Sequence, residues 1–295
     1  MIQARQINTI PSKEIEKIKT GIYGFDNLVG GGLVPGSTML FAGEPGVGKS
    51  TLLLQLAAAF AKQDKVLYIS GEESMSQIKL RADRLGAVNP QIYCSENIAL
   101  EDILLLVENL NPKLMIIDSL QMVYSRASKV MPGSPSQMKK VLLKLISLAK
   151  EKDMVLITIG HSTKSGMIAG LLTLQHMVDA TMFMSISEED GIRLLEVKKN
   201  RFGAGQEIWE IEMAEHGFKD INEGVIIFEN TDEIVNGIEK RVFRDEHTEM
   251  SQAIGQILEK AIYLIFFMFH FVKNITGINK LFSHKKHANN NKKSK

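Results

Sequence analysis

The sequence predicts an α/β protein with a mostly parallel central sheet, helices on both faces of it and an antiparallel extension. Over residues 38–159, short apolar runs of strand length alternate with longer stretches of helical period. This pattern is typical of parallel strands joined by helical crossovers. After residue 180 the apolar runs follow one another directly, and two of them flank the turn at residues 188–191, which indicates a hairpin.

The strongest chemical signal is a glycine-rich loop between an apolar run and a helix. The loop consists of Gly43, Glu44, Pro45, Gly46, Val47, Gly48, Lys49, Ser50 and Thr51. Glycines at this spacing let successive backbone N–H groups face one centre, to which the following helix adds its positive amino end. The GxxxxGKS pattern predicts that Lys49 reaches the β- and γ-phosphates of ATP and that the Ser50 hydroxyl binds Mg²⁺. The whole loop is therefore predicted to hold the nucleotide.

Strands and helices are predicted to alternate after this loop. The strand-like runs occupy residues 65–70, 91–94, 114–118 and 154–159. Helical periods cover residues 52–60, 78–85, 100–110 and 138–148. Gly86 with Pro90 ends the second of these helices, Asn111-Pro112 ends the third, and Ser136 is predicted to cap the fourth.

The antiparallel extension is predicted from four later apolar runs. They cover residues 180–186, 192–197, 208–213 and 224–228. The single tryptophan, Trp209, lies in the third of these runs. It is predicted to be a packing residue rather than a platform for a ligand.

Acidic residues follow two of the parallel strands, on the edge where the glycine loop also lies. Asp118 ends an apolar strand about 70 residues after Lys49, as a Walker B acid does, and is predicted to hold Mg²⁺. Glu72 is favoured as the group that orients the attacking water, with Glu73 as its neighbour. The alternative is a solvated acidic cap on the next helix. His161 ends another strand on this edge and is a candidate sensor of the γ-phosphate.

The composition excludes several classes of protein. Hydrophobic residues make up 44% and charged residues 23%, as in an ordinary globular chain. Cys94 is the single cysteine, which excludes an internal disulfide and a multi-cysteine zinc site, so no zinc is expected. The first residues lack the apolar core of a signal peptide, and a cytoplasmic location is expected.

A basic turn follows the second strand of the hairpin. It contains Lys198, Lys199 and Arg201. Such a turn is usually a solvated surface. In a ring of subunits, however, a cation on one subunit reaches the phosphate bound by the next and acts as an arginine finger. The residues alone leave both interpretations open.

Taken in order, these motifs resemble the RadA (Sms) family of bacterial RecA-like ATPases. The resemblance rests on residues 20–21, 30–37, 43–51, 68–74, 77–86, 116–119, 132–134, 136–137, 160–161, 163–164, 168–170, 176–179 and 199–203. The last motif, Lys199-Asn200-Arg201-Phe202-Gly203, is the most specific mark of the family. The resemblance implies a RecA-like P-loop NTPase core over roughly residues 18–220.

The resemblance also implies an activity. The family hydrolyses ATP as a hexameric ring on single-stranded DNA, and it promotes branch migration of recombination intermediates in DNA repair. It implies that Lys49, Ser50 and Thr51 bind the nucleotide and Mg²⁺, and that Glu72 is the catalytic base and Asp118 the Walker B acid. It also implies that Lys199 and Arg201 act across the subunit interface.

Two loops would face the channel of such a ring and touch DNA. They are residues 125–135 and 164–175, in which Arg126, Lys129 and Lys164 are the available cations. Where the family often has Gly-Pro and a basic residue in the second loop, this chain has Leu171-Leu172 after Gly170. The second loop therefore departs from the family pattern.

The chain is expected to divide into four parts: an N-terminal arm (1–17), the RecA-like ATPase domain (18–232), a helical apolar segment (233–282) and a basic disordered tail (283–295). The four-cysteine zinc module and the Lon-protease-like domain that usually flank the family's ATPase are expected to be missing, so a weaker homo-oligomer than a hexamer is also open. Residues 261–295 hold seven lysines and no acidic residue. Docking of the apolar segment on the core or a neighbouring subunit, and a weak membrane-surface contact, are both left open.

Two other functions remain open at this point. A KaiC-like regulatory ATPase, which switches protein partners without binding DNA, would share the glycine loop and Glu72-Glu73. A non-catalytic assembly protein would use ATP only as structural support.

Overall fold

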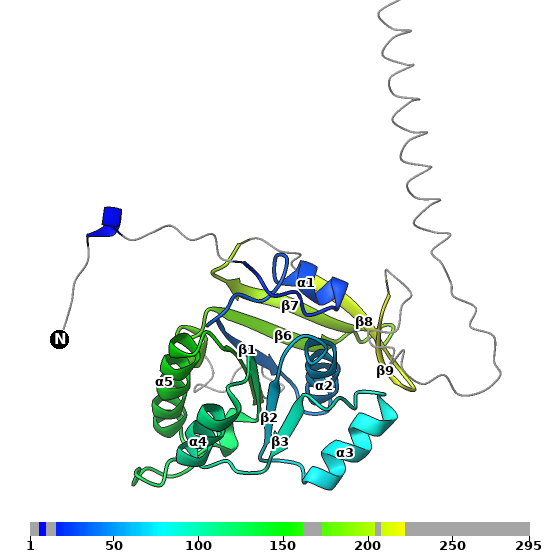
Figure 1. Cartoon of the computed structure of the whole chain (residues 1–295). Helices are drawn as coiled ribbons and strands as arrows, with labels where there is room; N and C mark the ends of the chain where they lie inside the picture. Colours follow the sequence, from blue (N-terminus) through cyan, green and yellow to red (C-terminus); the bar gives the residue numbers. More distant parts are fainter. Residues whose placement is uncertain (1–5, 10–15, 162–172, 204–207, 222–295) are drawn as a thin grey trace, which may run out of the picture. The chain divides into compact units, whose positions relative to one another are not determined.

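The fold is known from a computed structural model that describes residues 6–9, 16–161, 173–203 and 208–221 (Figure 1). Its described strands form one nine-stranded sheet in the order β3-β2-β4-β5-β1-β6-β7-β8-β9. The parallel strands are β1 (Thr38–Gly43), β2 (Val66–Ser70), β3 (Ile92–Ser95), β4 (Leu114–Asp118), β5 (Val155–His161) and β6 (Ala180–Ile186). The antiparallel strands are β7 (Arg193–Asn200), β8 (Ile208–Ala214) and β9 (Gly217–Asp220). The predicted mostly parallel sheet with an antiparallel extension is confirmed.

Helices cover both faces of the sheet (Figure 1). They are α1 (Tyr23–Leu28), α2 (Lys49–Phe60), α3 (Met75–Arg84), α4 (Leu100–Leu110) and α5 (Pro135–Glu151). Helices α1, α2 and α3 contribute to one apolar cluster, and α4 and α5 contribute to another. Strand β4 shows why two clusters arise: Leu114 and Ile116 join the first, whereas Met115 and Ile117 join the second. Side chains of a strand alternate between the faces of a sheet, so a strand buried on both faces is apolar throughout.

Three details differ from the expectations. Helix α5 begins at Pro135 and is capped by Ser134, whose side chain accepts from the backbone of Gln137, so the predicted cap at Ser136 is wrong. Proline suits the first helical position because it lacks an N–H that would have no partner there. Helix α1 and strand β9 were not predicted, and the expected strand at residues 224–228 lies outside the described residues.

Strand β9 connects the antiparallel extension to the glycine loop. The buried amide of Gln55 on α2 accepts from the backbone N–H of Phe218 at 2.9 Å and donates to its carbonyl at 3.2 Å. The Phe218 ring lies so close to Gly48 that a Cβ on that glycine would come within 2.5 Å of it. Gly48 has a φ of +110°, a conformation that glycine adopts readily, so residue type and neighbour both fix this position.

The side chain of Trp209 joins the extension to helix α1. It is 1% exposed, its Nε1 donates to Asp220 Oδ2 at 2.6 Å, and its ring meets Phe25 edge-on at 6.4 Å. The prediction that it packs in the core is confirmed.

Replacing Trp209 with alanine is expected to lower the free energy of unfolding by about 3–5 kcal/mol, because it leaves a cavity beside Phe25 and removes a buried hydrogen bond. Urea unfolding followed by circular dichroism measures the change. The matched control is Ile208→Ala on the same strand, where the side chain is 42% exposed and the loss should stay below about 1 kcal/mol. Equal losses in both variants would contradict a core role for Trp209.

Candidate active site

The glycine loop joins the carboxyl end of β1 to the amino end of α2. Gly46 and Gly48 both have positive φ, which turns the loop back on itself before the helix begins at Lys49. No side chain caps this helix, so its first N–H groups remain available to an anion in the loop. The loop is therefore built as a receptor for phosphate oxygens.

The Lys49 side chain lies inside this loop. It is 4% exposed, and its Nζ donates to the carbonyls of Gly43 at 2.8 Å and Glu44 at 2.7 Å. Burial lowers the pKa of the Lys49 ammonium, although nearby carboxylates, chiefly those of Asp118 and Glu72, act in the opposite direction. An ammonium held only by backbone carbonyls is ready to exchange them for phosphate oxygens.

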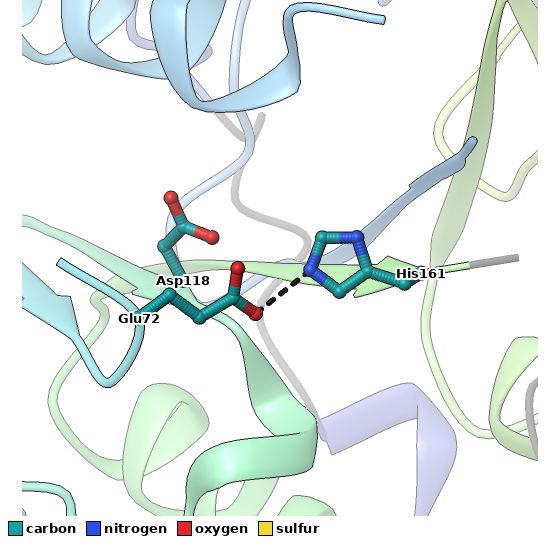
Figure 2. A group of neighbouring side chains, drawn as sticks. All are labelled: Glu72, Asp118 and His161. Atoms are coloured by element: carbon teal, nitrogen blue, oxygen red, sulfur yellow. Dashed lines mark hydrogen bonds and ion pairs between the residues drawn. The ribbon is translucent and has the colours of Figure 1, made fainter. Parts of the chain in front are cut away.

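Three parallel strands bring acidic and histidine side chains to the same edge of the sheet. Glu72, Asp118 and His161 follow or end β2, β4 and β5, which are neighbours in the sheet. Each offers one ligand atom, and these atoms all lie within 4.8 Å of one another. Figure 2 shows the Glu72 carboxylate pointing toward the His161 ring, with the Asp118 carboxylate beside them.

Asp118 has one oxygen with a partner and one without. Its side chain is buried, and its Oδ2 accepts from the Tyr68 hydroxyl at 3.0 Å. Burial, followed by the charge of Asp118, raises the pKa of Tyr68, so the phenol stays a donor. Among the described residues no group bonds to the buried Oδ1 of Asp118. An unsatisfied carboxylate oxygen at this depth suits Mg²⁺, either directly or through a bound water.

The two neighbouring glutamates have different surroundings. Glu72 accepts hydrogen bonds at Oε1 from Ser119 and, at 2.8 Å, from His161. Burial opposes its charged form, but these hydrogen bonds and the charge of Lys49 outweigh that effect and lower the pKa of Glu72. Glu73 instead pairs with Arg81 on α3, and burial raises its pKa. The geometry thus distinguishes them: Glu72 faces the phosphate loop, and Glu73 is bound to a helix.

The sequence alone did not assign two residues of this site. Tyr68 holds Asp118, and Ser119 holds Glu72. The only signal for Ser119 was its place directly after Asp118, and Tyr68 is an apparently ordinary member of an apolar strand. Their roles depend on the pairing of β2 with β4, which places Ser70 beside Asp118.

The predicted finger residues lie at the opposite end of the parallel strands from the glycine loop. The Nζ of Lys199 donates to three backbone carbonyls, of Gln175, His176 and Val178, at 3.0, 3.5 and 2.6 Å. Arg201 approaches Asp179 at 3.4 Å, and its side chain is 52% exposed. Asp179 itself accepts from Thr38, the first residue of β1. Both cations are therefore a strand length, roughly 16 Å, from the glycine loop of their own chain.

The first expected DNA-binding loop begins with paired side chains. Arg126 forms a bidentate ion pair with Asp102 on α4. Lys129 is exposed and forms no ion pair among the described residues. Lys164 lies outside the described residues, as does most of the second loop.

A hydrogen-bonded glutamate fixes the start of the first loop. Glu101 accepts from Ser125 Oγ at 2.6 Å and from the backbone N–H of Arg126 at 3.2 Å. The hydrogen bond from Ser125 is the main reason that the pKa of Glu101 falls from 4.5 to about 2. A carboxylate with a lowered pKa contributes stability above its unfolded pKa and loses it as the pH falls through the folded value.

Replacing Ser125 with alanine is therefore expected to move the titration midpoint of Glu101 from about 2 toward 4.5. The stability difference between wild type and variant should be full above pH 4.5 and should shrink as the pH falls toward 2. Carboxyl-carbon NMR titration measures the midpoint, and thermal melting at several pH values measures the difference. Ser128→Ala is the control, because Ser128 Oγ accepts from the backbone N–H of Val130, whereas it is Ser125 that donates to Glu101. An unchanged Glu101 midpoint in Ser125→Ala would contradict this assignment.

Comparison with protein families places the site in a known group. The model of a family described as "AAA domain" matches residues 9–167, which contain the glycine loop, Glu72, Asp118 and His161. The chain belongs to the AAA domain family. Among the residues that the structure describes, every helix is too short or too polar to span a bilayer.

The AAA domain and the strands after it are similar to bacterial DNA repair proteins. The chain is 41% identical over 216 residues to the DNA repair protein RadA of Bacillus subtilis, which is 73% of this chain and 47% of that protein. It is 36% identical over 236 residues to RadA of Escherichia coli, 80% of this chain and 51% of that protein. The match to RadA of Streptococcus pneumoniae is 39% over 212 residues, 72% of this chain and 50% of that protein. The predicted resemblance is confirmed, and the chain spans about half the length of these relatives.

The fold of the AAA domain also has a match among solved structures. A KaiC-like protein from the hyperthermophilic archaeon Pyrococcus horikoshii superimposes with a TM-score of 0.59 and 21% identity, over 70% of this chain and 98% of that one. At this identity the likeness shows the RecA/KaiC-like P-loop fold alone. It supports the predicted fold class and says nothing of substrate.

Proposed function

We propose that this protein hydrolyses ATP and couples hydrolysis to work on DNA in repair or recombination, as a homo-oligomer. The observation that carries the proposal is the meeting of Glu72, Asp118 and His161 beside Lys49, at the edge of the sheet where the glycine loop lies. A loop that holds phosphate explains binding alone. A carboxylate that stays charged next to it supplies a group to orient water, which is what hydrolysis requires in addition.

Each residue has a chemical task in the proposed reaction. Lys49 leaves the carbonyls of Gly43 and Glu44 and contacts the β- and γ-phosphates. Ser50 and Asp118 would hold Mg²⁺, which would neutralise phosphate charge. Glu72 accepts a hydrogen bond from the attacking water and aligns it with the γ-phosphate. His161, bonded to Glu72, senses whether the γ-phosphate is present.

Lys199 and Arg201 are proposed to act on a neighbouring subunit. Their distance from the loop of their own chain supports action in trans, because a cation at the far edge of the sheet cannot reach its own nucleotide. Arg201 gives up one long contact with Asp179 to do so, whereas Lys199 must leave three carbonyls. Arg201 is therefore the primary finger and Lys199 its support. A hexameric ring, or a weaker assembly, provides the required neighbour.

Single-stranded DNA is the proposed partner, and branch migration of recombination intermediates is the proposed process. The name of the RadA relatives supports a role in DNA repair. Arg126, Lys129 and Lys164 are proposed DNA contacts, with Arg126 available after it leaves Asp102. The proposed DNA substrate implies a cytoplasmic location. A weak membrane-surface contact of the segment after residue 233 is a separate proposal, and it lies outside the described residues.

Steady-state ATP hydrolysis, measured with and without single-stranded DNA at two salt concentrations, tests this function. DNA is expected to stimulate turnover, and the stimulation should weaken as salt rises, because phosphate contacts release counterions. Lys49→Ala is the control that removes turnover. Turnover that DNA does not change would instead favour the KaiC-like alternative, a regulatory ATPase that switches protein partners. The shared fold is compatible with this alternative. No turnover at all would favour an assembly protein.

A further inference from the structure

A hollow beside the first loop has no role in ATP hydrolysis. It has a volume of about 560 Å³ and lies between the start of α4, residues 125–128 and the exposed side of α5. We call it the α5 hollow. Its volume falls within the roughly 300–1,000 Å³ typical of small-ligand sites. It is therefore large enough for one nucleotide of a strand.

The floor of the α5 hollow is rigidly constructed. Gln137 lines it and is 1% exposed. With its amide oriented to satisfy its neighbours, Gln137 donates to the Val130 carbonyl at 3.0 Å and to Ser128 Oγ at 2.9 Å, and accepts from the backbone N–H of Ser125 at 3.0 Å. One buried side chain thus joins three points of the loop to α5. The hollow is a preformed feature of the fold.

The residues that line the hollow are of two kinds, apolar and positively charged. Leu100, Val141 and Leu143 provide apolar surface, and Leu143 remains 51% exposed although it is a large hydrophobic residue. Lys140 and Lys144 stand one helical turn apart on α5 and also line the hollow. An apolar wall beside two ammonium groups suits a ligand with a flat apolar face and negative charges.

The two lysines lack compensating charge. Among the described residues neither Lys140 nor Lys144 forms an ion pair, whereas Lys152, the residue directly after α5, pairs with Glu108 of α4. Like charges four residues apart on a helix repel each other. The acidic groups in the first turn of α4, Glu101 and Asp102, are already bound by Ser125 and Arg126. An external anion would relieve this repulsion.

We propose that the α5 hollow binds one nucleotide of single-stranded DNA, with the base against Leu100 and Leu143 and the adjoining phosphates on Lys140 and Lys144. This subsite rests on the proposed DNA-dependent function and deepens it. Charge complementarity argues for a polyanion, and the apolar wall argues for exposed bases rather than a duplex backbone. The base and the phosphates then contact different sides of the same hollow.

Fluorescence anisotropy with a labelled oligothymidine, measured across a salt series, tests the phosphate contacts. Lys140→Ala/Lys144→Ala is expected to weaken binding roughly 10- to 30-fold at 0.1 M salt and to lower the slope of log K against log salt by about 1.4. Lys150→Ala/Lys219→Ala removes two charges that lie outside the hollow, and it should change the affinity and the salt slope less. Lys140→Arg/Lys144→Arg keeps the charges and should keep the slope.

A second oligonucleotide of equal length with abasic sites tests the base contact. Wild type should bind it more weakly than oligothymidine, and Leu143→Asn should reduce this preference while it keeps the salt slope. If wild type binds DNA but the two lysine pairs behave alike, the subsite is wrong and the proposed function stands. If wild type ignores the abasic sites, the base contact is wrong. If wild type binds no single-stranded DNA at any salt concentration of the series, the subsite and the DNA-dependent function both fail.

Discussion

Replacing Glu72 with glutamine is expected to lower kcat for ATP hydrolysis by about 10²–10⁴-fold while ATP binding is retained. Glutamine keeps the size of the side chain and can still accept from Ser119 and His161, but it carries no charge to align and deprotonate water. Single-turnover hydrolysis measures the chemical step, and equilibrium binding of a fluorescent ATP analogue measures affinity. The effect should therefore appear in the rate and not in the dissociation constant.

Glu73→Gln is the matched control for this change. Glu73 is the next residue and has the same side chain, but it is bound to Arg81 and does not face the phosphate loop. Its replacement should alter kcat only a few-fold. If Glu73→Gln abolished hydrolysis and Glu72→Gln did not, the assignment of the catalytic base would be reversed.

Arg201→Ala is expected to reduce turnover by about 10³-fold or more, in the range of known arginine fingers, with nucleotide binding unchanged. Because the finger is proposed to act on the next subunit, a mixture of two inactive proteins should recover activity. Subunits with Lys49→Ala still carry Arg201, and subunits with Arg201→Ala still carry an intact glycine loop. Mixed oligomers therefore contain some complete sites.

Lys198→Ala is the control for Arg201. Lys198 lies on β7, three residues before Arg201, is 54% exposed and pairs with Glu196 on the same strand, so its loss should leave turnover near wild type. Normal hydrolysis by Arg201→Ala would show the trans assignment to be wrong. Failure of the mixture to recover activity, with oligomers verified by light scattering, would argue against it as well.

The sequence was informative where one local motif determines both structure and chemistry. The glycine loop needs particular residue types at fixed spacing, so Gly46, Gly48 and Lys49 could be placed without knowledge of the rest of the chain. Asp118 was also predictable, because a strand buried on both faces is apolar until it reaches the edge of the sheet. In each case neighbours along the chain carry the information.

Features that depend on distant partners were not predictable in this way. Glu72 and Glu73 are neighbours in the chain, and the positions of Ser119, His161 and Arg81 separate their roles. Strand β9 is four residues long, too short for its alternation to stand out, and it forms by pairing with β8. The cap of α5 was misplaced by two residues because Ser134 and Ser136 are both good capping residues, and Pro135 decides between them.

The contact between Phe218 and Gly48 sets a lower limit on the size of a working fragment. The motifs that identify the chain as a nucleotide-binding protein end well before β9, and a truncation designed from them alone would stop too early. Without Phe218 and the backbone bonded to Gln55, the turn that receives the phosphates would lose its outer support. The unit proposed to hydrolyse ATP thus extends through Asp220, some 170 residues beyond the glycine loop.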